Sequence, residues 1–306
     1  MTSASDVVDA INDISGAHPG YRAAHAKGVV CAGRFAPAPG ARLVSHAAHL
    51  QDDPVRTTVR LSNGAGDPTR PDGANDGRGL SVKFYLPDGS RTDIVAITLP
   101  VFFVRTPEDF LAFTRARKPD PETGQPDLEK VGAFLAAHPE AGPAIQFQLS
   151  MATPASRAQL RHFSIHAYRF RAADGTARFG RYRWEPEAGE AWLEAEEAEA
   201  KSADYLEDEL RERMAAGPVV FTLHVQLAEE GDPTDDPTAA WPEEREVVEL
   251  GRLELTGPDT EREQGDDVLV FDPTRVTDGI ECSADPILNF RPQAYSESVA
   301  RRTSVA

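Results

Sequence analysis

Residues 285–302 read DPILNFRPQAYSESVARR and are predicted to form a helix. At 3.6 residues per turn, Arg291 and Tyr295 are four positions apart and therefore lie on one face of that helix. Arg302 comes eleven positions after Arg291, about three turns, and returns to the same face. Pro292 has no N–H to donate to the carbonyl group four residues earlier, so we expect the helix to begin near Pro292 or to bend there.

The pair of Arg291 and Tyr295 is compatible with a metal ligand. A guanidinium group beside a phenol favours the phenolate form. Phenolate is a hard anionic oxygen ligand, and haem iron is one of the few metals in proteins that binds it. The same spacing also arises by chance on a surface helix, so this segment alone leaves both interpretations open.

The composition limits the class of protein. The chain has 306 residues, of which 40% are hydrophobic and 27% charged, which is typical of a soluble globular protein with a large core. A formal charge of −18 argues against nucleic acid and against anionic membranes as partners. No apolar run approaches the ~20 residues of a membrane span, and residues 1–20 lack the features of a signal peptide. Two cysteines, Cys31 and Cys282, fit reduced thiols in the cytoplasm, where we expect the protein.

Residues 1–20 carry a short amphipathic pattern, which predicts an arm or a first helix with Ser5 as its N-cap and Gly16 as its end. From residue 21 to residue 306 we find no internal repeat and no linker composition that would divide the chain. The sequence therefore predicts an N-terminal arm, residues 1–20, followed by one domain, residues 21–306.

Eight runs of alternating or apolar residues predict β-strands. They cover residues 29–35, 57–62, 78–85, 93–99, 163–170, 177–184, 219–226 and 245–255. A helical insertion separates the first four from the last four, with one helix from Pro107 and another at about 128–138, and an acidic run at 191–214 predicts a further helix. Eight antiparallel strands with long excursions predict an α+β fold built on a closed barrel or on a pair of sheets.

Five segments resemble motifs of the haem catalases. They are HAKG at 25–28, RGLSVKFY at 78–85, PVFFVR at 100–105, FDPT at 271–274 with GIECS at 279–283, and RPQAY at 291–295. Because they occur in family order and at compatible spacing, the sequence resembles the catalases from about residue 20 to residue 302. The resemblance is greatest to the small catalase-related peroxidase branch. It implies an eight-stranded antiparallel barrel with helical insertions, a C-terminal helix that carries the haem ligand, and haem b as cofactor.

The resemblance also implies roles for the residues on the proximal side of the haem. Tyr295 would be the axial ligand of the haem iron, and Arg291 would stabilise its phenolate. His166 and Asp285 match a histidine and an aspartate that continue a hydrogen-bonded chain from that arginine. A buried arginine needs an anionic partner of this kind to offset its desolvation.

Three arginines, Arg22, Arg60 and Arg302, match those that bind the haem propionates. Two carboxylates buried near a barrel wall would need about that much positive charge. Each arginine taken alone could instead belong to a surface ion pair.

On the distal side, His25 matches the catalytic histidine and Ser62 the serine that accepts its hydrogen bond. His25 would then act as general base and general acid towards peroxide. Phe110 matches the aromatic residue that stacks on the distal haem face, and Phe102 and Phe113 are candidates for the pocket wall. For these three phenylalanines a plain core role remains open.

One position departs from the family. Catalases have an asparagine three residues before the proline of the PVFFVR segment, and here that residue is Ile97. An amide that could hold peroxide is replaced by an aliphatic side chain, and strand alternation points Thr98 to the other face. Efficient dismutation of hydrogen peroxide is therefore in doubt.

Four functions remain open from the sequence. The first is a haem peroxidase that reduces hydrogen peroxide or organic hydroperoxides with a small organic reductant. The second is a weak true catalase, and the third is a fatty-acid hydroperoxide isomerase of the allene oxide synthase type. The fourth, a haem-binding protein without catalysis, fits less well because retention of haem needs no oriented distal base. Expected partners are peroxide and a small reductant, with a homo-oligomer possible.

Overall fold

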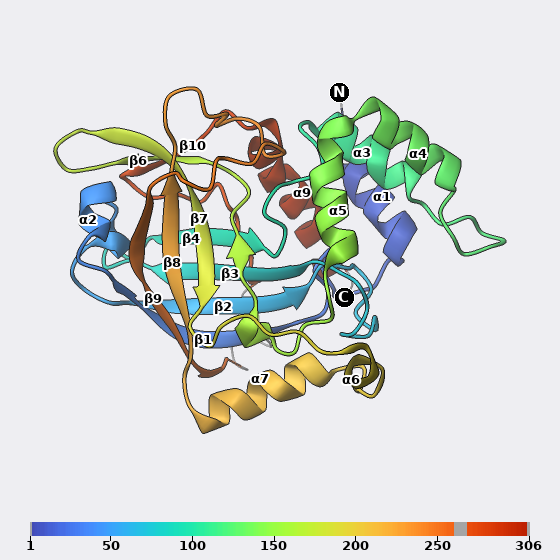
Figure 1. The fold of residues 1–306 in the computed structure, drawn as a ribbon, viewed down its shortest axis with the longest axis horizontal. Coiled ribbons are helices and arrows are strands. Elements are labelled where there is room, and N and C mark those ends of the chain that lie inside the picture. Colours follow the sequence, from blue (N-terminus) through green and yellow to red (C-terminus); the bar gives the residue numbers. More distant parts are fainter. Residues whose placement is uncertain (1, 260–267, 305–306) are drawn as a thin grey trace.

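The computed structural model describes residues 2–259 and 268–304, in which antiparallel strands form a closed barrel (Figure 1). Its strands are β1 (Gly28–Pro37), β2 (Val55–Asn63), β3 (Arg78–Tyr85), β4 (Arg91–Ile97), β5 (His162–Phe163), β7 (Ala177–Pro186), β8 (Val219–Leu227) and β9 (Val247–Pro258). They pair in the order β7-β5-β4-β3-β2-β1-β9-β8, and the pairing of β8 with β7 closes the ring. The predicted eight-stranded antiparallel barrel is confirmed.

Two short strands extend the sheet beyond the ring. β6 (Tyr168–Arg171) pairs with β7, and β10 (Ile280–Cys282) pairs with β6. The prediction of one continuous strand over residues 163–170 was wrong, because the chain leaves the ladder between β5 and β6. That interruption lets His166 contact the N-terminal end of the C-terminal helix. The sequence analysis did not predict β10.

Large side chains fill the inside of the barrel. Phe35 meets Phe84 edge to face with ring centroids 5.3 Å apart, and it meets Trp184 in the same way at 6.3 Å. All three side chains are fully buried. Burial of this much aromatic surface is a large part of the hydrophobic stabilisation. The interior is therefore a packed core, and functional side chains must lie on the outer face of the strands.

Helices cover one side and one end of the barrel (Figure 1). α1 (Ala4–Ser15) packs against α3 (Pro107–Ala116) and α9 (Pro286–Thr303), with α4 (Leu128–Ala137) and α5 (Gly142–Ser150) beside them. α6 (Ala195–Glu199) and α7 (Tyr205–Ala216) lie at the lower end of the view, and α2 (Ala41–Val44) lies at the far left. None of the helices in the described residues is long and apolar enough to span a membrane.

Three helix predictions need correction. The N-cap of α1 is Ser3 rather than Ser5, because the Ser3 hydroxyl accepts the Asp6 N–H and completes a capping box. The acidic run at 191–214 forms α6 and α7 instead of one helix. α9 begins at Pro286, well before Pro292, which lies inside the helix. The early start follows from Asp285, whose carboxylate accepts the first backbone N–H groups of α9.

Gly251 in β9 has a φ of 151°, which few L-residues adopt. A Cβ atom there would collide with the carbonyl oxygen of Ala36 and lie 2.6 Å from the ring of Phe35. We expect Gly251→Ala to lower the free energy of unfolding by about 2–4 kcal/mol through strain and overpacking. Urea unfolding measures the loss, with Gly217→Ala as control, since nothing lies within 4 Å of a methyl group added there. Equal stability of the two variants would contradict this account.

Candidate functional site

The outer face of β2, β3 and β4 forms one wall of the candidate site. Val59, Leu61, Leu80, Val82, Ile94 and Ala96 belong to the core, so strand alternation turns the residues between them outward. In the ladder, Ser62 pairs with Gly79 and Gly79 with Ile97. Arg60, Ser62, Gly79, Ser81, Val95 and Ile97 line a cavity between this face and α9.

His25 enters the cavity from the segment before β1. Its φ of 56° makes it the one non-glycine residue with positive φ in the described part of the chain. Its N–H donates to the carbonyl oxygen of Gly64 at 2.9 Å, and its Nδ1 forms a hydrogen bond with the Ser62 hydroxyl at 3.0 Å. Strained backbone of this kind is found where the fold holds a functional group in one orientation. The bond to Ser62 leaves Nε2 for a substrate.

Gly79 makes the approach of His25 to Ser62 possible. A Cβ at this position would lie 2.8 Å from the Ser62 hydroxyl oxygen and 3.0 Å from His25 Nδ1. Real Cβ atoms do not come this close to neighbours, so a larger residue would displace one of the two side chains. Gly79 belongs to the RGLSVKFY segment at 78–85, but the residue pattern of this segment does not predict a role for it.

The imidazole of His25 is a neutral base at neutral pH. Burial, and then the positive charges of Arg60 and Arg291, lower the pKa of His25 to about 3. Both causes disfavour the protonated ring, as expected for a cation placed in a dry cavity beside other cations. The His25 ring therefore stays neutral, with a free lone pair, over the whole physiological pH range.

The opposite wall of the cavity is α9. Arg291, Ala294, Tyr295, Ser298, Val299 and Arg302 all line it. The guanidinium carbon of Arg291 lies 5.9 Å from the centre of the Tyr295 ring, as the four-residue spacing predicts. The structure therefore brings the predicted ligand tyrosine and its arginine to the side of the cavity that faces His25 and Ser62.

Behind α9, His166 and Asp285 form a buried pair. His166 Nδ1 lies 2.6 Å from an Asp285 carboxylate oxygen, and both side chains are at most 1% exposed. Burial lowers the pKa of His166 to about 4, so the neutral ring donates its Nδ1–H to the carboxylate. The structure records no hydrogen bond between His166 and Arg291, and the buried Nε2 of His166 has no partner there. Of the predicted series of hydrogen bonds, the link between His166 and Asp285 is present. Arg291 affects His166 through its positive charge, which lowers the pKa of His166.

The three arginines predicted to bind the haem propionates lie together at one end of the cavity. Arg22 and Arg302 both donate to the carbonyl oxygen of Leu269, at 2.8 and 3.1 Å, and Arg60 donates to Ala26 O at 3.1 Å. All three also line a second hollow that shares this end with the first. Arg22 and Arg60 lie in the first fifth of the chain and Arg302 near its end, so only the fold brings the three side chains together.

Three predicted aromatic residues lie outside the lining of the cavity. Phe102, Phe110 and Phe113 belong to an aromatic cluster with Phe103 and pack against one another. The stacking role expected for Phe110 stays a prediction, and the contacts of all three phenylalanines are those of a hydrophobic cluster. Ile97 borders both the cavity and this cluster.

The lining of the cavity suits an apolar group that carries carboxylates at one end. Its walls include Val8, Ile11, Val95, Val270, Phe271, Ala294 and Val299, and its charged end holds three arginines. Arginine guanidinium groups bind carboxylates strongly. A phenol oxygen from Tyr295 on one wall suits the iron of a haem, and the His25 imidazole faces it. Val8 and Ile11 come from the segment that the sequence analysis described only as an arm or first helix.

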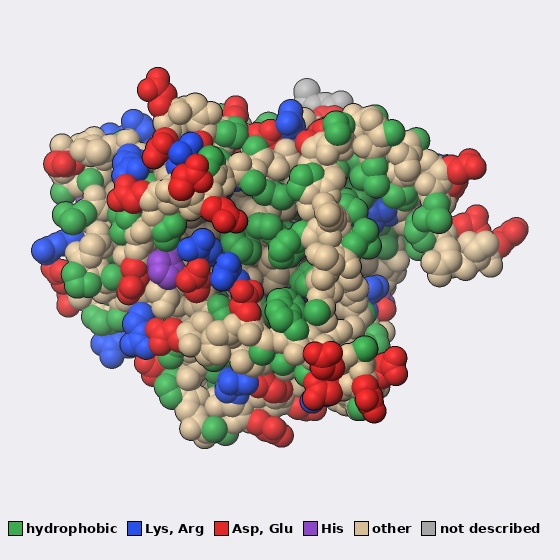
Figure 2. Space-filling view, viewed as in Figure 1, with side chains coloured by type: hydrophobic (Ala, Val, Ile, Leu, Met, Phe, Trp, Pro, Cys, Tyr) green, Lys and Arg blue, Asp and Glu red, His purple; other side chains and the backbone are tan. Residues whose placement is uncertain are grey.

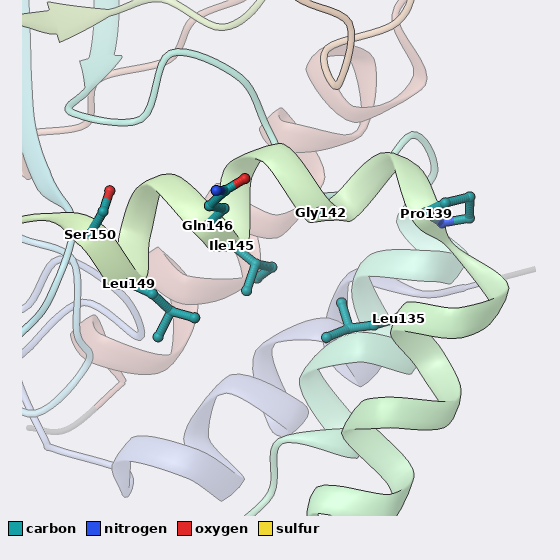
Figure 3. A pocket seen from close by; sticks show the side chains of 7 residues that line it. All are labelled: Leu135, Pro139, Gly142, Ile145, Gln146, Leu149 and Ser150. Atoms are coloured by element: carbon teal, nitrogen blue, oxygen red, sulfur yellow. The ribbon is translucent and has the colours of Figure 1, made fainter.

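A separate groove lies between α4 and α5 and contains no group suited to catalysis (Figure 3). It is lined by Leu135, Pro139, Gly142, Ile145, Gln146, Leu149 and Ser150. Hydrophobic side chains gather around these helices on the surface (Figure 2), and Leu149 is 75% exposed. Its lining has no titratable side chain, in contrast to the cavity beside α9.

Comparisons with known proteins agree with this geometry. Residues 7–306 match the model of the catalase family. The chain is 44% identical to a "Catalase-related peroxidase" from Mycolicibacterium paratuberculosis, over 97% of this chain and 94% of that protein. It is 35% identical to another protein of that name from Synechococcus elongatus, over 97% of this chain and 88% of that one.

Solved structures show the same fold. A fungal catalase crystal structure superposes with a TM-score of 0.82 at 27% identity, covering 93% of this chain. The present chain spans about three fifths of that catalase, 59% of its length. With the barrel, the facing walls of the cavity and the match over residues 7–306, the chain belongs to the catalase family.

Proposed function

We propose that the protein is a haem b peroxidase, which reduces hydrogen peroxide or an organic hydroperoxide with electrons from a small organic reductant. The observation that carries this proposal is the pair of facing walls in one cavity. The hydrogen-bonded His25 and Ser62 lie on one wall, and Tyr295 with Arg291 lies on the other. The names of the two relatives support the peroxidase activity.

Tyr295 and the three arginines would hold the haem, through a phenolate ligand and through ion pairs with the propionates. When bound, the haem supplies a redox-active iron at which the O–O bond of a peroxide can be cleaved. His25 Nε2 takes the proton from the peroxide oxygen nearer the metal and returns it to the departing oxygen. The reductant supplies two electrons and two protons in total, so that a hydroperoxide yields an alcohol and water. Ser62 keeps the His25 ring oriented for both transfers.

Ile97 favours the peroxidase over the alternative of dismutation in this proposal. Dismutation needs a second hydrogen peroxide to be held over the metal, and Ile97 offers it no hydrogen bond. An aliphatic wall also accepts the alkyl group of an organic hydroperoxide more readily than a polar one. A cytoplasmic location and a homo-oligomeric state stay predictions.

The decisive experiment compares His25→Ala with Tyr295→Phe. We expect His25→Ala to bind haem normally but to cleave peroxide at least ~10²-fold more slowly, the low end for loss of a positioned acid–base group. We expect Tyr295→Phe to lose the ferric tyrosinate spectrum and most of its haem, because the anionic ligand is gone. Haem titration and stopped-flow mixing with peroxide measure the two effects. If His25→Ala cleaves peroxide at the parental rate, or Tyr295→Phe keeps the parental spectrum, the assigned roles are wrong.

Gly79→Ala tests whether the contact of His25 with Ser62 matters for the rate. The added methyl group would separate the two side chains, and a misplacement of about 1 Å can slow a reaction by up to ~10²-fold. We expect peroxide cleavage to slow by about tenfold or more while haem affinity stays near the parental value. Gly132→Ala in α4 is the matched control, since nothing lies within 4 Å of its added methyl group. Parental kinetics in Gly79→Ala would show that the pair tolerates separation.

Ile97→Asn tests which reaction follows the first peroxide. An amide at this position restores a hydrogen bond worth roughly 0.5–1.5 kcal/mol to a second hydrogen peroxide. We expect oxygen evolution to rise relative to dye oxidation by a few-fold to about tenfold, at 1.4 kcal/mol per decade. The oxygen electrode and a dye assay on the same preparation give this ratio. An unchanged ratio would exclude Ile97 as its determinant and would favour the weak-catalase alternative.

A further inference from the structure

The three residues of the distal unit, His25, Ser62 and Gly79, come from separate stretches of the chain. His25 precedes β1, Ser62 lies in β2 and Gly79 lies in β3. Backbone pairing already places Ser62 beside Gly79 and ties His25 to Gly64, just after β2. The hydrogen bond between the side chains of His25 and Ser62 is 3.0 Å long, so a shift of about 1 Å in the segment that carries His25 would break it. Contacts outside the cavity that restrain this segment therefore bear on the distal unit.

Asp72 lies between β2 and β3 and contacts a chain neighbour of each distal residue. Its carboxylate oxygen Oδ1 lies 3.1 Å from Nζ of Lys27, two residues after His25. The same oxygen accepts a hydrogen bond from Nδ2 of Asn63, the residue after Ser62, at 2.8 Å. Its backbone carbonyl accepts a hydrogen bond from Nη2 of Arg78, the residue before Gly79, at 2.7 Å.

The remaining contacts of Asp72 anchor it to the body of the protein. Oδ2 accepts the backbone N–H of Leu206 in α7 at 2.9 Å, and Arg157 Nη2 lies 3.4 Å from Oδ1. The Asp72 side chain is 0% exposed and those of Lys27 and Arg157 are 9% and 2% exposed. These contacts are charge-assisted and shielded from water, which makes them stronger and more directional than contacts at the surface.

Lys27 completes the connection. Its ammonium group also lies 2.6 Å from Asp204 and donates to the carbonyl oxygen of Ala203 at 2.8 Å. The carboxylates of Asp72 and Asp204 together offset the charges of Lys27 and Arg157. A buried ion pair adds little net stability compared with apolar side chains, yet removal of one partner is costly. Its benefit here is geometric, because Lys27 is only two residues from the strained His25.

We propose that Asp72 is a positioning residue for the distal unit. Its carboxylate sets the distance between His25 and Ser62 above Gly79, and so the rate of proton transfer to and from peroxide. Asp72 touches neither substrate nor haem. Its carboxylate acts through Lys27 and Asn63, whereas its link to Arg78 is made by the backbone carbonyl and stays in a side-chain variant. This inference rests on the proposed role of His25.

The test uses Asp72→Asn, which keeps the size of the side chain and removes its charge, and Asn63→Ala, which removes one link and leaves the ion pair intact. Asp232→Asn is the matched control, since Asp232 is likewise little exposed, at 6%, and pairs with an arginine, Arg245, but contacts no residue that lines the cavity. We expect peroxide cleavage to slow by about 10- to 100-fold in Asp72→Asn and a few-fold in Asn63→Ala, and to be unchanged in Asp232→Asn. Haem affinity should stay within a few-fold of the parent in all three.

A second readout does not depend on turnover. Nitrogen-15 spectra of the histidine rings in the haem-free protein, with His25→Ala to assign the signal, report the tautomer of His25. In the parent and in Asp232→Asn we expect one tautomer, held by Ser62. In Asp72→Asn and Asn63→Ala we expect the nitrogen shifts to move towards the average of the two tautomers. A variant that loses stability for general reasons would not produce this change at one histidine.

The outcomes separate the inference from the function it rests on. If Asn63→Ala and a folded Asp72→Asn keep both the parental tautomer and the parental rate while His25→Ala is slow, Asp72 does not position the distal unit. If Asp72→Asn does not fold, Asn63→Ala decides between the same two results. If His25→Ala itself cleaves peroxide at the parental rate, the proposed acid–base role fails first.

Discussion

Closure of the barrel is the constraint on which the rest of the structure depends. Once β8 pairs with β7, every strand has one face turned to a packed interior and one face turned outward. The interior is filled by aromatic and aliphatic side chains, so chemistry is possible only outside. The cross-strand register then fixes which outward residues are neighbours, and it places Ser62, Gly79 and Ile97 in one row. The alternation of side chains along each strand and the register between strands therefore determine which residues form this wall of the site.

The second wall of the site comes from a helix whose position is set by electrostatics. Asp285 accepts the first N–H groups of α9 with one carboxylate oxygen and the His166 N–H with the other. One buried carboxylate therefore begins the helix and attaches it to the segment between β5 and β6. Tyr295 lies ten residues further along a rigid helix, so its place opposite His25 depends on this anchor. Two buried aspartates thus have similar roles on the two sides of the cavity. Asp285 anchors α9, and Asp72 binds residues next to His25 and Ser62.

The sequence could predict the elements that local chemistry determines. Seven of the eight strands followed from alternation and turn residues, while the eighth, predicted over 163–170, is interrupted. The pairing of Arg291 with Tyr295 followed from helical periodicity. Contacts between distant segments were accessible only through resemblance to a family, as for Arg22 and Arg302, which share the carbonyl oxygen of Leu269. The role of Gly79 depends on a distance of closest approach, and no pattern of residue types reports it. Pro292 left two alternatives for α9, a start near this proline or a bend at it, and the N-cap Asp285 with Pro286 at the first turn excludes the first.

The backbone conformation of His25 lowers the stability of the fold, while it positions a side chain that the proposed activity needs. A non-glycine residue at φ 56° costs of order 1 kcal/mol or more, and glycine would occupy the same conformation without that cost. Selection for a more stable fold alone would thus favour glycine at the one position where an imidazole is needed. The free energy of unfolding is therefore lower than it would be with glycine at this residue, and other contacts of the fold offset the cost. Any engineered or evolved variant freed from the need to cleave peroxide should lose this histidine early, and such a loss would mark the point at which a descendant of this chain ceased to be an enzyme.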